Sequence, residues 1–332
     1  MFKIENVPGV LLLIVVAVIS TFASDLVIIG GKHPLEASAV AVVLGILIRN
    51  FNYVPDKCRS GVNLSEKLLI IGIVLMGAGL DLTKIGSQGA AMLSIILVTM
   101  VVGFFLIFFV ARFVQLPIGL SMLLAVGTTI CGTSAIAVTA PLIKAREEET
   151  SYAIATVALF GLIAILLYPY IGHLFHASDL EFGVFAGTAI HSTPQVIGAG
   201  YIYSDSAGQT ATAVKLVRNC FMAPVAILIA IWFSRNSENE AVSKINFWKA
   251  FPWFLFGYFV MAGCNSQGLF SATLVEQLSS AGKFLILLGM AGVGLNTNFA
   301  AFKTVGLKPL LVGFLGAVIV AVVSATMIAF LI

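Results

Sequence analysis

Long apolar stretches separated by short polar connections dominate the pattern of this chain. A membrane-spanning helix needs about 20 mostly apolar residues. Nine stretches approach or exceed that length: 9–30, 36–50, 66–84, 89–113, 150–174, 209–234, 247–266, 281–298 and 307–332. The longest connections between them are Phe51–Ser65 and Arg235–Asn246. The pattern therefore predicts an all-α polytopic membrane protein that forms a single integral membrane domain over residues 1–332.

Two further stretches, 118–143 and 181–202, are apolar but interrupted by small and polar residues. The first contains GTTICGTSAIAVTAP from Gly127, and the second contains GTAIHSTPQVIGAG from Gly187. Glycine, proline and hydroxylated residues weaken a helix, and irregular backbone at membrane depth needs surrounding protein or a water-filled cavity. We therefore predict discontinuous or re-entrant helices here, about 9–11 transmembrane segments in all, and a transport site between the two interruptions.

The distribution of lysine and arginine predicts the orientation, because cytoplasmic loops are enriched in both. If all eleven segments cross, 11 basic residues share the side of the N-terminus and 5 lie opposite, with Lys215 and Arg218 inside a helix. If both interrupted segments return to the side they entered, Lys144 and Arg146 change sides and the split becomes 13 to 3. We expect a cytoplasmic N-terminus on either count, and the second count favours re-entrant segments without deciding the question.

Short internal echoes suggest a repeat. Gly77-Ala-Gly79-Leu80-Asp81 resembles Gly292-Val-Gly294-Leu295-Asn296, and these two spans run in opposite directions in both topologies. The start of the first interruption, Gly127-Thr128-x-Ile130, likewise resembles Gly187-Thr188-x-Ile190. Inverted repeats with discontinuous helices and a midplane site are typical of secondary transporters. We predict repeat-like halves of about 1–145 and 180–332.

Composition narrows the class of protein. Hydrophobic residues make up 60% of the 332 and charged residues 10%, against about 25% charged in a soluble domain. A net charge of +3, scattered along the chain, argues against a nucleic-acid partner. The four cysteines show no metal-binding spacing, so we expect no metal site and no cofactor beyond a coupling Na⁺ or H⁺.

Lys215 and Arg218 are the most distinctive charged pair. They lie three residues apart, on one face of a helix, and a helix that starts near Gln209 places Arg218 roughly 13 Å deep. An ionised side chain there needs a cavity or a partner. One interpretation is an anion-binding site, since a guanidinium grips oxyanions in a bidentate manner. The other is that the helix starts later and both side chains extend to the membrane surface.

The remaining candidate residues fall into two groups. The substrate-binding candidates join Lys215 and Arg218 to polar residues of the interruptions: Thr128, Cys131, Thr133, Ser134, His191, Thr193 and Gln195. Asp81 and Asn296, at echoing positions, are the candidates for ion coupling. A buried carboxylate can titrate near neutral pH, and so can histidine. Asp81 at a wet helix end, and hydroxyl groups that serve only helix packing, are the competing interpretations.

Several ordered motifs carry a family resemblance. They are Ile130-Cys131-Gly132-Thr133-Ser134-Ala135, Pro141-Leu-Ile-Lys144-Ala145, the run from Gly187 to Gly200, Lys215-x-x-Arg218-x-x-x-x-Ala223-Pro224 and Lys308-Pro309-Leu310. With these motifs the chain resembles the YeiH-type sulfate exporter family, within the grouping of cation/proton antiporters and bile-acid-type symporters. The resemblance implies a multi-pass protein of the bacterial inner membrane, with crossed discontinuous helices in a core domain beside a panel domain. Asp81 departs from the family, which often has a basic residue there.

We therefore expect a secondary active transporter of a small anion, sulfate-like or organic, that works by alternating access and is not an enzyme. Its partners would be the solute and the bilayer, and a homodimer stays open. The alternative is a cation/proton antiporter with Asp81 as the coupling carboxylate. An intramembrane enzyme with Cys131 and His191 as a nucleophile and base is a third hypothesis. On this basis Arg218→Gln would abolish anion uptake and leave folding intact.

Overall fold

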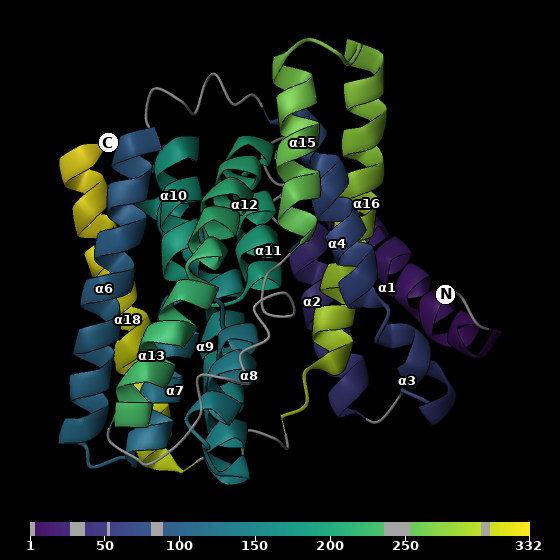
Figure 1. Ribbon diagram of the computed structural model, residues 1–332. Helices are drawn as coiled ribbons and strands as arrows, with labels where there is room; N and C mark the ends of the chain where they lie inside the picture. Colours follow the sequence, from purple (N-terminus) through teal and green to yellow (C-terminus); the bar gives the residue numbers. More distant parts are fainter. Residues whose placement is uncertain (1–3, 27–36, 52–53, 81–88, 236–252, 300–305) are drawn as a thin grey trace. The chain divides into compact units, whose positions relative to one another are not determined.

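A computed structural model describes residues 4–26, 37–51, 54–80, 89–235, 253–299 and 306–332, and these residues form helices joined by turns (Figure 1). The prediction of an all-α polytopic protein is confirmed. Seven helical spans among the described residues are long and apolar enough to cross a membrane, by length and composition, and two of them, Asp56–Gly79 and Asp205–Phe233, join consecutive shorter helices. The chain folds as two compact units, residues 1–86 with 254–300 and residues 87–253 with 301–332.

The first unit contains the N-terminal helices and a later pair. Its elements are η1 (Ile4–Asn6), α1 (Val7–Leu26), α2 (Ala37–Asn50), α3 (Asp56–Val62), α4 (Ser65–Met76), η2 (Gly77–Gly79), α15 (Phe254–Ser266) and α16 (Ala272–Asn296). Helix α16 packs antiparallel to α4, because Gly292 faces Ser65, Gly289 faces Leu69 and Gly282 faces Gly72. The predicted opposite directions of the two echoing spans are thus confirmed.

Glycines allow the backbones of this unit to approach closely. A Cβ atom on Gly294 would lie 2.3 Å from the carbonyl oxygen of Val42, and one on Gly61 would lie 2.1 Å from that of Asn6. Small residues at helix crossings are a common packing device in membranes. These contacts make the first unit a dense helix bundle.

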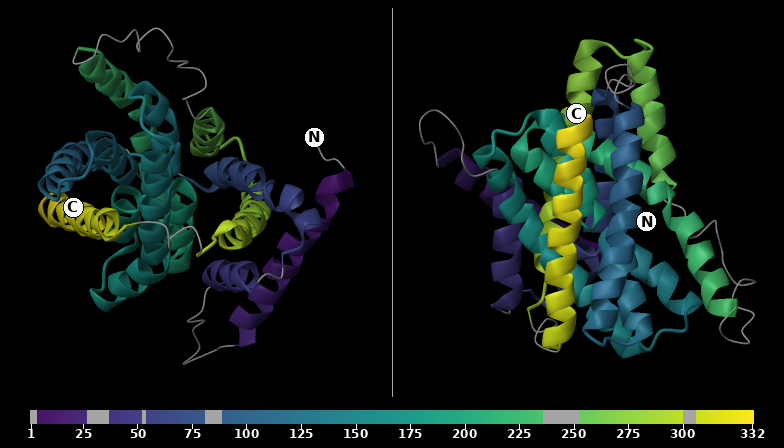
Figure 2. Two further views of the ribbon diagram at one scale, coloured as in Figure 1. Left: turned by 90° about the horizontal axis from the view of Figure 1, so that it is seen from below. Right: turned by 90° about the vertical axis from the view of Figure 1, so that its left-hand side faces the viewer.

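The second unit contains long helices and two pairs of short ones. Its elements are α6 (Gly89–Phe113), α7 (Ile118–Thr129), α8 (Thr133–Leu142), α9 (Glu147–Leu174), α10 (Asp179–Ala189), α11 (Thr193–Tyr203), α12 (Asp205–Cys220), α13 (Met222–Arg235) and α18 (Leu307–Leu331). The α6 and α18 helices run side by side (Figure 2), with Gly103 of α6 against Val320 and Gly316 of α18 against Ile107.

Each interrupted stretch folds into a helical hairpin that turns back midway along this unit (Figure 1). In the α7–α8 hairpin, Gly127 packs on Ile136, and the outer end, at Gly119, contacts Glu149 in the first turn of α9. In the α10–α11 hairpin, the first turn of α10 meets the last turn of α11, where the Phe182 and Tyr203 rings stack 4.0 Å apart. This second hairpin packs on the other end of α9.

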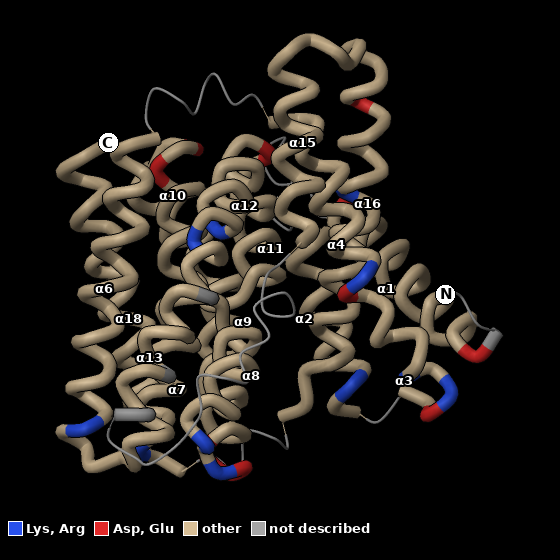
Figure 3. Tube along the Cα trace, in the orientation of Figure 1, with Lys and Arg blue, Asp and Glu red and all other residues tan. Residues whose placement is uncertain are grey.

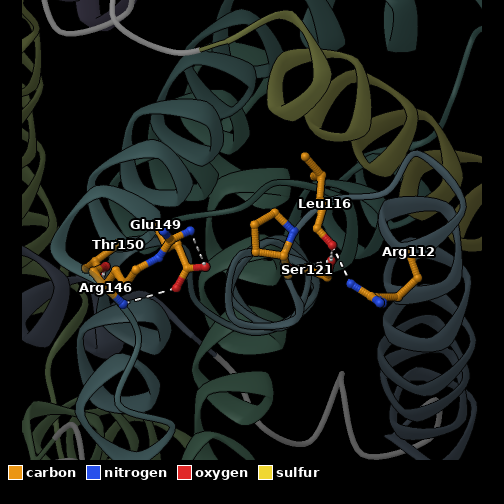
Figure 4. A network of polar contacts seen from close by, with 7 residues as sticks. Arg112, Leu116, Ser121, Arg146, Glu149 and Thr150 are labelled. Atoms are coloured by element: carbon orange, nitrogen blue, oxygen red, sulfur yellow. Dashed lines mark hydrogen bonds and ion pairs between the residues drawn. The ribbon is translucent and has the colours of Figure 1, made fainter.

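The hairpins decide between the two topologies that the sequence left open. Since each outer end contacts an opposite end of α9, the two hairpins enter the unit from opposite sides. Re-entrant segments are therefore what the structure contains, and neither interrupted stretch is a crossing helix. Arg112 and Arg146 both lie near the outer end of the α7–α8 hairpin (Figure 4), where Arg112 contacts Leu116 just before α7 and Arg146 pairs with Glu149, which lies against Gly119.

The outer faces of the long helices are apolar. On α6, exposed side chains recur every four residues: Val101, Phe105, Phe109 and Phe113. On α18 they are Leu311, Phe314, Val318 and Val322. Extended apolar surface of this kind needs an apolar environment, so these faces suit contact with lipid.

Three boundaries differ from the predicted segments. The connection Phe51–Ser65 contains helix α3, which starts after Pro55 and packs through Gly61 on Gly9. Helix α16 begins at Ala272, where Ser271 caps its first turn, and not at residue 281. The apolar pattern missed this start because the first part of the helix contains polar residues and has a low hydropathy. The stretch 209–234 is two helices, α12 and α13, that meet at Phe221.

Candidate functional site at the hairpin tips

The two hairpins meet tip to tip inside the second unit. Tip 1 is residues 130–132, between α7 and α8, and tip 2 is residues 190–192, between α10 and α11. A Cβ atom on Gly132 would lie 3.0 Å from Cβ of Ser192, and Cys131 Sγ lies 3.5 Å from Thr193 Oγ1. Four helix ends therefore converge here, the C-termini of α7 and α10 and the N-termini of α8 and α11.

Local sequence explains why the helices stop at the tips. Gly132 adopts φ 58° and ψ −132°, a backbone conformation that residues other than glycine rarely adopt. At tip 2, Ile190 and Ser192 are extended, with ψ angles of 145° and 152°. Pro194 then occupies the first turn of α11, where its missing N–H costs nothing.

Arg218 of α12 binds the carbonyl oxygens that α7 and α10 leave free. Its Nε donates to Thr129 O at 2.7 Å and its Nη2 to Thr128 O at 2.9 Å. Its Nη1 donates to Gly187 O and Ile190 O, both at 3.1 Å. The last carbonyls of a helix have no partner within the helix, so one guanidinium caps two helices at once.

Lys215 completes the same arrangement one turn earlier on α12. Its Nζ donates to Ile130 O at 2.9 Å in tip 1. In tip 2 it donates to Ile190 O at 3.1 Å and His191 O at 2.5 Å. An ammonium has three donors, and all three are used. Neither Lys215 nor Arg218 extends to a surface, since their relative exposures are 0% and 1%, so the interpretation of surface-seeking side chains is wrong.

These two cations have no acidic partner among the residues that the structure describes, where the ion pairs are Arg59–Asp56 and Arg146–Glu149. Asp and Glu lie toward the helix ends in the second unit (Figure 3). Each helix C-terminus supplies about half a negative charge and each N-terminus about half a positive one. The two C-termini therefore offset about one of the two cationic charges, and the tips keep a net positive charge.

The N-termini of α8 and α11 differ in whether side chains bind the backbone around them. No side chain caps α8, and Ser134 in its first turn is exposed while Thr133 is half-buried. In α11, the Oε1 atom of Gln195 accepts from Ser192 N at 3.2 Å, and its Nε2 donates to Ala158 O of α9. Gln195 therefore fixes the backbone of tip 2, and its amide is occupied by protein contacts.

A short polar chain links α12 to both tips. Asn219 Nδ2 donates to Thr193 Oγ1 at 3.1 Å, and the same hydroxyl lies next to Cys131 Sγ. Three buried atoms around the tips have no hydrogen-bond partner, namely Thr128 Oγ1, His191 Nδ1 and Asn219 Oδ1.

The structure brings together all nine predicted substrate-binding residues: Thr128, Cys131, Thr133, Ser134, His191, Thr193, Gln195, Lys215 and Arg218. The ion-coupling pair is different. Asn296 is exposed at the end of α16 in the first unit, and Asp81 lies outside the described residues.

Sequence reasoning missed the backbone carbonyls that bind the cations, and it left Asn219 out of the site. Carbonyl oxygens carry no signature in a sequence, so residues such as Gly187 gave no sign of a role as acceptors. Asn219 did give a signal, because it is an amide directly after Arg218 in an apolar stretch.

Polar contacts also lie at the outer end of the α7–α8 hairpin (Figure 4). An Nη1 atom of Arg112 donates to the carbonyl of Leu116, and Ser121 Oγ donates to Pro117 O at 2.9 Å. The buried Glu149 accepts from Arg146 N at 3.0 Å and lies against Gly119 of α7. Each of these hydrogen bonds is local, so they satisfy the polar groups where α6 ends and where α7 and α9 begin.

Comparisons with known proteins place the chain among membrane proteins. A family model described as Conserved hypothetical protein 698 matches residues 8–313. A UPF0324 membrane protein of Clostridium tetani is 32% identical over 95% of this chain and 94% of its own length. One from Streptococcus pneumoniae is 32% identical over 94% of this chain and 93% of its own, and one from Nitratidesulfovibrio vulgaris is 32% identical over 93% and 89%. These names specify no substrate, so the resemblance to sulfate exporters stays a prediction.

Proposed function

This chain belongs to the UPF0324 membrane protein family, and we propose that it is a secondary transporter of a small anion that works by alternating access. The observation that carries the proposal is the pair of buried cations, Lys215 and Arg218, held between two hairpin tips with no acidic partner among the described residues. Net positive charge in a poorly hydrated place attracts an anion.

The first turn of α8 is the part of this site best suited to hold the anion. Free N–H groups at a helix start, together with the helix dipole, favour negative charge. Ser134 is exposed there and no side chain caps the helix, so a solute can approach. Lys215 and Arg218 already donate to carbonyls. We therefore assign them an indirect role, in which they fix both tips and supply the charge without touching the anion.

Ligand-induced stabilisation tests the proposal. A ligand that binds only the folded state raises apparent stability, by about 2.7 kcal/mol at a hundredfold excess over Kd. Purified full-length protein should melt at a higher temperature with one or more of sulfate, nitrate, acetate and succinate, at constant ionic strength. Reconstituted vesicles should then take up that anion. If no anion in the set changes the melting temperature or crosses the vesicle membrane, the proposal is wrong.

Substitution at Ser134 locates the anion. In Ser134→Asp a tethered carboxylate would occupy the helix start, which stabilises the helix by about 0.3–1 kcal/mol and competes with the solute. Ser134→Asn has a similar size and no charge, so it serves as the matched control. We expect the Asp variant alone to lose its thermal response to the anion. Equal responses from both variants would place the anion elsewhere.

The antiporter alternative makes a different prediction. A cation/proton antiporter would give transport currents that follow a Na⁺ gradient, would show no response to anions and would depend on Asp81. Solid-supported-membrane recordings with Na⁺ gradients and with anion gradients therefore separate the two mechanisms. Asp81→Asn would abolish the Na⁺ response of an antiporter.

A further inference from the structure

We infer that His191 binds a proton when an anion occupies the hairpin tips, so that the two are carried together. The inference rests on the proposed anion site and adds the coupling ion and its carrier. It starts from a side chain that is fixed in the site and has an unused hydrogen-bonding atom.

The backbone of His191 is fixed from two directions. Its carbonyl accepts the 2.5 Å hydrogen bond from Lys215 Nζ, and the next residue, Ser192, is held by Gln195 through its N–H. The residue is 1% exposed. The imidazole ring is therefore held at tip 2, where an anion bound between the tips would lie next to it.

The imidazole has an unused nitrogen at this place. His191 Nδ1 is buried and has no hydrogen-bond partner in the structure. A buried polar atom without a partner is unfavourable, so a group that bonds this nitrogen would stabilise the site. An anion accepts a hydrogen bond from a protonated ring nitrogen, and a protonated imidazole has a donor on both nitrogens.

The charges around the ring determine when it can take up that proton. Lys215 and Arg218 act on it from α12, and the Cys131 thiol lies at the opposing tip. No Asp or Glu forms an ion pair with these cations in the described part of the chain. A third positive charge is therefore disfavoured in the empty site, and a bound anion removes that penalty.

The two cations are poor carriers of the proton themselves. Each of the three N–H groups of Lys215 is accepted by a tip carbonyl. Arg218 holds four carbonyls and stays protonated in proteins. Loss of a proton from either would leave a carbonyl without a donor. His191 can gain and lose a proton without breaking any of these bonds.

Linkage makes the coupling reciprocal, so the effect can be measured from either ligand. If anion binding promotes protonation, acid must tighten anion binding. One linked proton changes the apparent Kd by up to about tenfold per pH unit. The anion affinity should therefore rise as the pH falls through the range in which the anion-bound protein takes up the proton.

Calorimetric titration of the purified full-length protein with sulfate, and in parallel with nitrate and acetate, tests the inference. Titrations in buffers of different ionisation enthalpy count the protons taken up per anion. We expect the wild-type protein to take up close to one proton, and His191→Gln to bind the anion with none. His176→Gln is the matched control, because His176 is exposed at the end of the unit. It should behave as wild type.

Each other result has a definite meaning. Unchanged proton uptake in His191→Gln would overturn the inference and leave the anion site standing. Binding by the wild-type protein without proton uptake would overturn it whatever the variants do. If neither sulfate, nitrate nor acetate binds and the wider anion screen also fails, the proposed function itself is wrong. Melting curves for His191→Gln and His191→Asn would show that lost uptake does not reflect lost folding.

Discussion

The two hairpin tips perform the same task in different ways. Both tips present carbonyl oxygens to Lys215, and the helices that lead into them, α7 and α10, present theirs to Arg218. Tip 1 turns on the unusual backbone of Gly132, and the helix after it has no side-chain cap. Tip 2 turns through extended residues, and Gln195 binds its backbone to α9. One tip is thus a bare turn and the other is anchored.

The helices around the tips extend this difference. In the second hairpin, the Thr188 hydroxyl lies 2.6 Å from Ser324 Oγ of α18, so α10 is fixed to a long helix as well. Thr188 also donates to Val184 O of its own helix, as Thr129 of the first hairpin does to Ala125 O, but the hydroxyl of Thr129 has no second partner on another helix among the described residues. The anchored hairpin is therefore part of the scaffold. We expect the tip without a cap to be the one that meets the solute.

The largest expected effect is the loss of the guanidinium that caps both α7 and α10. Arg218→Gln removes the charged donor from Thr128 O and Thr129 O of α7 and from Gly187 O of α10, which we expect to cost about 3–5 kcal/mol of unfolding free energy. Urea or thermal unfolding in detergent measures this. The contacts thus change the expectation from sequence, which was lost uptake with intact folding.

Arg218→Lys is the matched variant for this prediction. It keeps the charge, but its single nitrogen has three donors in place of the planar guanidinium that holds four carbonyl oxygens. It should fall between the wild type and Arg218→Gln. Stability equal to that of the wild type in both variants would show that the tips hold together without the guanidinium.

The next effect separates the turn of tip 1 from its contact with tip 2. Gly132→Ala adds a Cβ atom to a backbone with φ 58° and places it 3.0 Å from Cβ of Ser192. We expect a loss of roughly 2–3 kcal/mol from the strained backbone and the close contact. The same unfolding measurement applies.

Gly268→Ala is the control for strain alone. Gly268 also has a positive φ, 70°, but nothing lies within 4 Å of an added Cβ. It should cost about 1–2 kcal/mol. If the two glycine variants lose equal stability, the approach of the tips contributes nothing.

A smaller effect tests whether tip 2 is the anchored one. Gln195→Ala removes two hydrogen bonds, to Ser192 and Ala158, and should cost about 1–2 kcal/mol. Ser134→Ala, at the corresponding turn of the first hairpin, should stay within about 0.5 kcal/mol because the residue is exposed. A reversed order of the two values would contradict the proposed division between anchor and open tip.

Much of this arrangement was predictable from the pattern of residues. Apolar length gave the helices, with 89–113 matching α6 at both ends. The polar interruptions predicted the two breaks, because glycine, threonine and proline weaken a helix. The pair Lys215 and Arg218 gave the centre of the site, since buried charge in an apolar helix needs a partner nearby.

The partners of that pair could not be predicted. We expected an anion to face Lys215 and Arg218, and the structure instead pairs them with backbone carbonyls. Carbonyls are present at every residue, so only the folded geometry reveals which ones lie at the ends of α7 and α10. The same limit applies to the hairpin topology, which depends on which end of α9 each outer turn contacts.

The smallest expected effect compares the outer ends of the two hairpins. Helix α10 starts with a capping box, in which Ser178 N donates to Glu181 Oε2 at 2.7 Å and Glu181 N donates to Ser178 Oγ at 3.2 Å. Helix α7 starts at Pro117 with no side-chain cap. The hydrogen bonds from Ser178 lower the pKa of Glu181 below its usual value of 4.5.

A lowered pKa means that the carboxylate stabilises the folded state above about pH 4.5 and that this contribution is lost as the pH falls through the folded-state pKa. Glu181→Gln should therefore lower stability near neutral pH by about 0.5 kcal/mol, a small value because the site is exposed. The difference from wild type should shrink in acid. Glu148→Gln, a first-turn glutamate of α9 that is also exposed, should show little change at either pH. A deficit that persists below the folded-state pKa would show that the glutamate acts through packing and not through its charge.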